Sequence, residues 1–302
     1  MQTQPIDFHP PAEEAAPILL PVTTTLFADR ADRFASLASG HALADWLNFL
    51  GALSRAQHDA LKALPALPLP DAAALAQARQ HGMPPLDLGK RPAAWRDSLR
   101  QIARSAQPLA PETIQADLQR LIEADDAELD RLADALMQGN IAPGDALRIP
   151  FVAAALQVVF TDLASRFDAS QLVKFEQHNV CPCCGSPAVA SVVRLGAAIN
   201  NLRYLHCSVC NTEWNVPRAV CTSCGTDKDV AQQEIDGKQG AARAETCDSC
   251  KSYLKIVYQE KDPRVDPVAD DLASLALDLL VDEAGYERAG PNLFLIHAPE
   301  AV

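Results

Sequence analysis

The chain has 302 residues, 48% of them apolar and 22% charged, with a formal net charge of −13 at pH 7. This composition is typical of a globular protein with one sizeable core and room for small modules. The negative charge argues against a surface that holds nucleic-acid phosphates. The N-terminus lacks the basic start and apolar run of a secretory signal, and no stretch has 18 uninterrupted apolar residues. We therefore expect a soluble, cytoplasmic protein with no membrane insertion.

Residues 1–175 are predicted to form an all-helical domain, because alanine and leucine dominate and apolar residues recur at helical spacing. Asp71 is a plausible N-cap, and Phe151 to Phe167 is apolar on nearly every side, as expected of a helix surrounded by neighbours. Further helices are predicted around Leu43–Pro65, 71–82, 95–102 and 114–137, the last as two helices or one bent helix. Trp46 and Trp95 lie on apolar stripes and are predicted to be core residues.

The cysteines carry the strongest signal in the sequence. Eight of the nine form four Cys-x-x-Cys pairs, and the last two pairs repeat the first two at an offset of 40 residues. Two residues between cysteines let one tight turn aim both sulfurs at a single metal ion. The predicted metal ligands are Cys181, Cys184, Cys207 and Cys210 in one site and Cys221, Cys224, Cys247 and Cys250 in the other.

The segments between the cysteine pairs are predicted to be β-ribbons. The predicted modules span 176–216 and 217–262, each with two strands between its pairs and a third strand after its last pair. Turns are expected at 196–201 and at Asp236-Gly237. Gly185 and Gly225 each follow a leading pair, where the turn needs a residue without Cβ. About 40 residues cannot build a sufficient core alone, so the metal is expected to supply folding free energy.

Residues 263–302 are predicted to contain one amphipathic helix, Pro267 to Ala284, whose acidic residues face away from the protein. This helix is expected to pack on the ribbons or on the helical domain. Leu293 to Ile296 is predicted to be an edge strand. The predicted fold class is thus multi-domain α+β: a helical domain, two tandem metal modules and a C-terminal helix.

The residue types leave some questions about the metal sites open. Tetrahedral thiolate sites suit iron and zinc alike. The pairs could combine sequentially or in a cross-braced manner, and we favour the sequential arrangement because each 40-residue unit is then self-contained. Cys183 lies outside the repeat, and its side chain is expected to point away from the metal. His178 and His206 border the first site but are interpreted as ordinary residues, because four cysteines already fill a tetrahedral site.

The cysteine motifs resemble those of a known family. CPCCGSP at 181–187, RYLHCSVCNTEW at 203–214, CTSCG at 221–225 and CDSCKSYLKIVY at 247–258, behind a helical domain, are similar to the formate dehydrogenase accessory protein FdhE. The resemblance implies rubredoxin-like metal modules with iron favoured over zinc. It also implies a cytoplasmic maturation factor that binds the catalytic subunit of respiratory formate dehydrogenase before export through the twin-arginine route.

We expect no enzymatic activity, because the sequence has no phosphate-binding loop, nucleophile elbow or metal-hydrolase motif. The acidic run Glu123 to Glu128 is interpreted as a solvated helix face. Two other functions stay open: a rubredoxin-type electron-transfer protein, and a zinc-ribbon nucleic-acid binder, which would need a basic surface. A thioredoxin-type activity fits less well, because that motif occurs once, at a helix start. A switch in which thiol oxidation ejects the metal is a further alternative.

Overall fold

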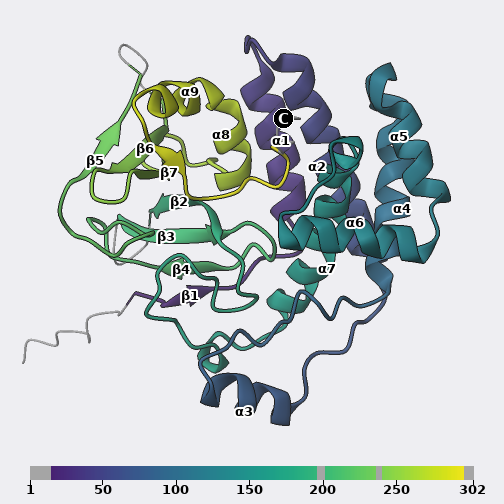
Figure 1. Ribbon diagram of the computed structural model, residues 1–302, viewed down its shortest axis with the longest axis horizontal. Coiled ribbons are helices and arrows are strands. Elements are labelled where there is room, and N and C mark those ends of the chain that lie inside the picture. Colours follow the sequence, from purple (N-terminus) through teal and green to yellow (C-terminus); the bar gives the residue numbers. More distant parts are fainter. Residues whose placement is uncertain (1–14, 196–200, 236–239, 296–302) are drawn as a thin grey trace, which may run out of the picture.

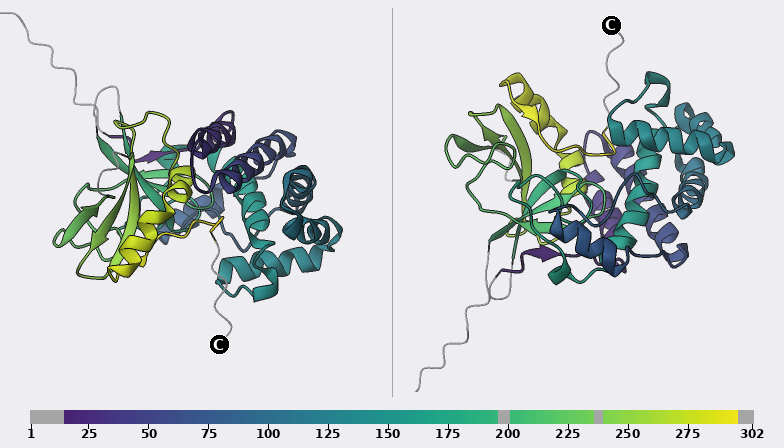
Figure 2. Two further views of the ribbon diagram at one scale, coloured as in Figure 1. Left: turned by 90° about the horizontal axis from the view of Figure 1, so that it is seen from above. Right: turned by 60° about the horizontal axis from the view of Figure 1, so that its bottom comes forward.

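The computed structural model describes residues 15–195, 201–235 and 240–295. Helices gather in one half of the molecule and strands in the other, with the C-terminal helices at their junction (Figures 1 and 2). This arrangement confirms the predicted α+β class. In the described part of the chain, no helix combines the length and apolar composition that crossing a membrane requires.

In the part of the chain that the structure describes, seven α-helices precede the cysteine-rich region. They are α1 (Leu26–Ala38), α2 (Ala44–Ala63), α3 (Ala72–Gln80), α4 (Ala94–Ala106), α5 (Glu112–Glu123), α6 (Asp126–Gln138) and α7 (Ile149–Ser165). Asp71 caps α3 as predicted, accepting a hydrogen bond from the Ala74 amide at 2.8 Å. Of the two options for 114–137, the structure has two helices, because Asp125 caps α6 through the Glu128 amide. Trp95 is fully buried, whereas Trp46 is half-buried.

Helix α7 lies at the centre of the helical region. Every residue from Phe151 to Thr161 is buried, and the helix packs against α2, α4 and α6. Burial on all sides explains why this segment is apolar around its whole circumference. The prediction of a central buried helix is therefore confirmed.

All strands among the described residues belong to one sheet. They are β1 (Ile18–Leu19), β2 (Ala188–Arg194), β3 (Leu202–Cys207), β4 (Glu213–Asn215), β5 (Val230–Gln233), β6 (Ala242–Cys247), β7 (Ser252–Tyr258) and β8 (Glu287–Arg288). The order is β1-β4-β3-β2-β7-β6-β5, and β8 pairs with β7. The two predicted ribbons are present. The sequence did not predict that β2 and β7 pair in parallel and join them into one sheet. Residues 196–200 of the first predicted turn and both residues of the second, Asp236-Gly237, lie outside the described residues.

The C-terminal region differs from the prediction in three ways. The expected single helix is two, α8 (Pro267–Ala273) and α9 (Leu275–Glu283), separated at Ser274. The acidic residues of α8 do not face away: Asp270 and Asp271 are buried and paired with basic side chains. The expected strand at Leu293 to Ile296 is wrong for residues 293–295, and Ile296 lies outside the described residues. As expected, the region packs on both parts of the molecule, with α8 against α1, β2 and β7.

A buried lysine explains the helix break. Lys255, in β7, is almost completely buried, and its Nζ donates hydrogen bonds to the carbonyl oxygens of Asp271 and Ser274 at 2.6 and 3.1 Å. Carbonyl groups at a helix end have no partner within the helix, so the ammonium group stabilises the end of α8. The same ammonium group forms an ion pair with Asp271 at 3.2 Å. The break therefore supplies partners for a charge that would be costly to bury alone.

Candidate metal centres

The structure brings the eight predicted ligands together in two groups of four. One group is Cys181, Cys184, Cys207 and Cys210, and the other is Cys221, Cys224, Cys247 and Cys250; the sulfur atoms of each group lie within 4.8 Å of one another. The pairs therefore combine sequentially, as favoured from the sequence, and the cross-braced alternative is excluded.

The sulfur geometry fits a tetrahedral ion. The distance between sulfurs is 3.6 Å for Cys181 and Cys210 and 3.4 Å for Cys184 and Cys207. In the second group the corresponding distances are 3.7 and 3.8 Å. Four sulfurs about 2.3 Å from a central zinc ion would lie about 3.8 Å apart. All nine cysteines are free thiols, so each group has the donors and nearly the spacing that a divalent ion requires.

Each Cys-x-x-Cys turn ends in the left-handed backbone region. The residues that follow the second cysteines, Gly185, Asn211, Gly225 and Lys251, have φ angles of 76°, 57°, 78° and 55°. This backbone conformation lets the chain fold back over the sulfurs. The Gly185 and Gly225 amides each donate a hydrogen bond to the carbonyl of the first cysteine of their turn at 2.9 Å. The sequence predicted this role for the two glycines. Asn211 could also have been found, because asparagine tolerates positive φ better than most residues.

The first group lies in the protein core. All four of its cysteines are buried, and its turns are held from outside the module. The Leu86 amide donates to the Cys183 carbonyl at 3.0 Å, and Gln157 of α7 donates to the Ser208 carbonyl at 2.8 Å. Both cysteine turns of this group are therefore fixed by segments of the helical region.

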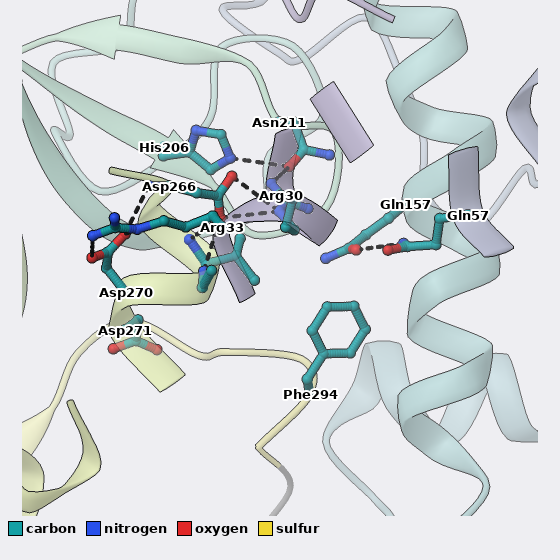
Figure 3. Close-up of polar contacts among 12 residues, drawn as sticks. Arg30, Arg33, Gln57, Gln157, His206, Asn211, Asp266, Asp270, Asp271 and Phe294 are labelled. Atoms are coloured by element: carbon teal, nitrogen blue, oxygen red, sulfur yellow. Dashed lines mark hydrogen bonds and ion pairs between the residues drawn. The ribbon is translucent and has the colours of Figure 1, made fainter. Parts of the chain in front are cut away.

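A buried polar network continues from the first group into the helices (Figure 3). Asn211, which follows the ligand Cys210, donates to Thr161 of α7 at 2.8 Å and accepts from Arg30 of α1 at 2.9 Å. Arg30 also donates to Asp266, the N-cap of α8, at 3.1 Å. His206 contacts Asn211 through Nε2 at 3.0 Å. One turn of the first site is thus connected to α1, α7 and α8.

Three residues near the first group are not part of it. His206 is engaged by Asn211 and Glu213, and His178 accepts a hydrogen bond at its backbone carbonyl from Trp214; neither belongs to the grouped ligands. Cys183 also stays outside the group of four. Interaction with Cys210, together with burial, holds the pKa of the Cys183 thiol well above its ordinary value.

Metal binding by the first group requires its thiols to lose protons. Burial, together with the neighbouring thiols, holds the pKa values of Cys181 and Cys207 well above their ordinary values in the metal-free protein. Burial also raises the pKa of Cys210, but hydrogen bonds with the neighbouring thiols outweigh it and hold that pKa well below its ordinary value. Thiolates bind a metal far better than thiols do, so an ion must displace protons from these sulfurs. A divalent cation would supply the charge that stabilises the thiolate form in this buried place.

The second group belongs to the part of the sheet formed by β5, β6 and β7, with Cys247 at the end of β6. Figure 1 shows these strands on the side of the sheet away from helices α1 to α7. Cys221 and Cys247 are buried, but Cys224 and Cys250 are exposed. The hydroxyl of Ser252 lies 3.0 Å from the Cys250 sulfur. The two groups therefore share a ligand pattern but have different surroundings.

Comparison with known proteins gives matches along nearly the whole described chain. Family models described as "FdhE, N-terminal", "FdhE, central domain" and "FdhE, C-terminal domain" match residues 15–177, 180–218 and 219–295. A protein named "Protein FdhE homolog" from Serratia proteamaculans is 39% identical over 287 residues, which cover 94% of this chain and 92% of the relative. A homologue of the same name from Edwardsiella ictaluri is 41% identical over 283 residues, 93% of this chain and 91% of the relative.

The solved structures contain a similar chain. The crystal structure of the FdhE protein from Pseudomonas aeruginosa matches with a TM-score of 0.84 and 38% sequence identity, over 94% of this chain and 99% of that chain. The match therefore includes both the helical region and the cysteine-rich sheet. Together with the three family models, it shows that the chain belongs to the FdhE family.

Proposed function

We propose that this protein is a cytoplasmic accessory factor in the assembly of respiratory formate dehydrogenase. In this role it binds the catalytic subunit before that subunit is exported through the twin-arginine route. It does not catalyse a reaction itself. Its two four-cysteine groups each hold one metal ion, with iron favoured over zinc.

Family membership across both halves of the chain, with all eight cysteines grouped, is the observation that carries this proposal. The preference for iron comes from the resemblance of the cysteine motifs, since four thiolates accept either metal. The negative net charge of −13 also favours a protein partner over a nucleic acid.

The residues of the chain suggest how metal would contribute to binding. When bound, each ion cross-links two cysteine turns, and iron would in addition provide a one-electron redox centre. The four sulfurs of each group then hold a ribbon in one conformation. A surface that is ordered before it meets its partner loses less conformational entropy on binding.

Affinity capture from anaerobically grown cells tests the proposal. The tagged chain is expected to contain two metal equivalents by elemental analysis and to retain the catalytic subunit of formate dehydrogenase from the cytoplasmic fraction. Deletion of the gene is expected to abolish respiratory formate dehydrogenase activity. The double variant Cys184→Ser, Cys224→Ser, with one ligand removed from each group, serves as the control and should fail to restore that activity.

Two outcomes would contradict the proposal. One is a purified, folded chain that contains no transition metal. The other is full formate dehydrogenase activity in the deletion strain, together with no retention of the catalytic subunit.

A further inference from the structure

The two cysteine groups have identical spacing but unequal access to solvent. All four sulfur-bearing residues of the first group are at most 4% exposed. In the second group, Cys224 and Cys250 are exposed. These two are the second cysteines of their turns, so each turn of the second group presents one sulfur-bearing residue to solvent.

The first group is enclosed by the helical region and by its own backbone. Its turns are fixed by Leu86 and Gln157 of the helical region. Three backbone amides, those of Cys183, Val209 and Cys210, lie 3.4 Å from its sulfurs as donors. A competing ligand could reach an ion in this group only after the helices and the sheet separate locally.

The second group is held by neighbouring segments but keeps exposed residues. The Asp248 amide donates to the carbonyl of Asp229, which precedes β5, at 2.9 Å. The Lys251 carbonyl accepts a hydrogen bond from the Glu287 amide of β8 at 2.8 Å, and Asp248 accepts one from Tyr286 at 3.0 Å. Even so, Ser249, Cys250 and Lys251 are all exposed. A ligand from solution, or from a bound partner, can therefore approach this group without unfolding the protein.

We propose that the second group is an exchangeable metal site, open to incoming thiolate or chelating ligands, whereas the first is closed and structural. The inference rests on the proposed function, since both require that the groups hold metal. In each exchange step an incoming donor atom forms a bond to the ion as the bond to Cys224 or Cys250 breaks. The released thiolate takes a proton from solvent, and the metal keeps its oxidation state.

The release kinetics of zinc from the full-length protein test this inference. Zinc avoids redox side reactions, and the anaerobically prepared chain is first loaded to two equivalents. After addition of a chromogenic chelator, one equivalent is expected to leave at least about tenfold faster than the other, because only the slow one requires local opening. Release of both equivalents at a single rate would overturn the inference.

Maleimide labelling during chelation identifies the site that opens first. Peptide mass spectrometry of the wild-type chain is expected to find Cys224 and Cys250 modified at the rate of the fast phase. Cys184 and Cys210, their counterparts 40 residues earlier, are expected to react only in the slow phase. Labelling of the first group in the fast phase would overturn the assignment, and this readout needs no variant that might misfold.

Matched variants separate this inference from the proposed function. Cys250→Ser is expected to retain one equivalent of zinc and to lose the fast phase of zinc release. Cys210→Ser is expected to lose the slow phase. A fast phase that persists in Cys250→Ser contradicts the inference. A wild-type chain that never binds two equivalents contradicts the proposed function as well. Two equivalents that leave together contradict only the exchangeable site.

Discussion

Equivalent cysteines of the two groups occupy different environments. Cys184 is 4% exposed in the core, whereas Cys224, 40 residues later, is exposed at the outer part of the sheet. We expect Cys184→Ser to lower the free energy of unfolding by more than about 3 kcal/mol, because structural metal sites contribute folding energy directly. Denaturant unfolding of metal-loaded protein measures this change.

Cys224→Ser is the matched control for that substitution. It is expected to lower the free energy of unfolding by less than half as much as Cys184→Ser and to leave one metal equivalent bound. The reason is that the protein core does not depend on the turn that contains Cys224. Equal losses of stability from the two variants would mean that the second group is as much a part of the core as the first.

The carboxylate of Glu213 is stabilised in its charged form. Burial alone raises its pKa, but Arg194, with His206, outweighs burial and lowers the pKa from 4.5 to about 2. Its stabilising contribution is therefore complete above about pH 4.5 and is lost as the pH falls towards 2. We expect Glu213→Gln to cost about 1 to 3 kcal/mol, because it leaves the half-buried Arg194 guanidinium without its carboxylate partner.

Unfolding of metal-loaded protein at about pH 6, 7 and 8 checks this prediction, well above the range in which Glu213 titrates. The difference between the variant and the wild type should stay constant across these three conditions. Glu234→Gln is the control: Glu234 pairs with Arg243 at 3.0 Å but is 56% exposed, so its loss is expected to cost less than about 1 kcal/mol. A difference that disappears between pH 6 and 8 would refute the assigned ionisation.

At the scale of elements, the join between the two ribbons depends on close packing around β2 and β7. The backbone at Gly290 packs closely against these strands. A Cβ added to Gly290 would lie 2.4 Å from the Ala188 carbonyl oxygen and 2.4 Å from a methyl carbon of Leu254. Gly290→Ala is therefore expected to cost about 1 to 3 kcal/mol, because a backbone atom must move. Thermal unfolding measures the effect. Gly144→Ala, where a Cβ meets nothing within 4 Å, should change stability by less than about 0.5 kcal/mol.

The helices and ribbons could be predicted because their signals are local. The apolar residues of 151–167 recur around a whole helix, and the cysteine pairs mark where each ribbon turns. The pairing of β2 with β7 brings together Ser191 and Ile256, 65 positions apart, and nothing in either strand specifies that partner. Strands β1 and β8 have two residues each, too few to show any periodicity.

The ligands of the metal sites could be predicted, but their environments could not. Identical spacing in the two modules gives no sign of which one packs against the helices. The burial of Asp270 and Asp271 depends on Arg33 and Lys255, which come from other elements. An acidic residue on an amphipathic helix is ordinarily solvated, so only the tertiary structure reveals these partners.

At the scale of the whole molecule, the first metal group connects the two halves. Gln157 and Thr161 of α7 each bond to its second turn, and Arg30 links the same turn to α1 and α8 (Figure 3). A buried polar network is stabilising only while every member keeps its partner. Loss of the first ion should therefore loosen helices that contain no ligand at all.

Hydrogen exchange tests this coupling. After the second group alone is emptied, amides of 149–165 in α7 are expected to keep their protection, while those of β5 and β6 exchange faster. After both groups are emptied, the α7 amides are expected to exchange at least about tenfold faster, because the turn that Gln157 and Thr161 contact no longer has a fixed conformation. Cys250→Ser, with only the first group loaded, provides the control and should match the half-emptied wild type. If α7 kept full protection in the metal-free protein, the helices would be stable independently of the first site, and the metal would order the sheet alone.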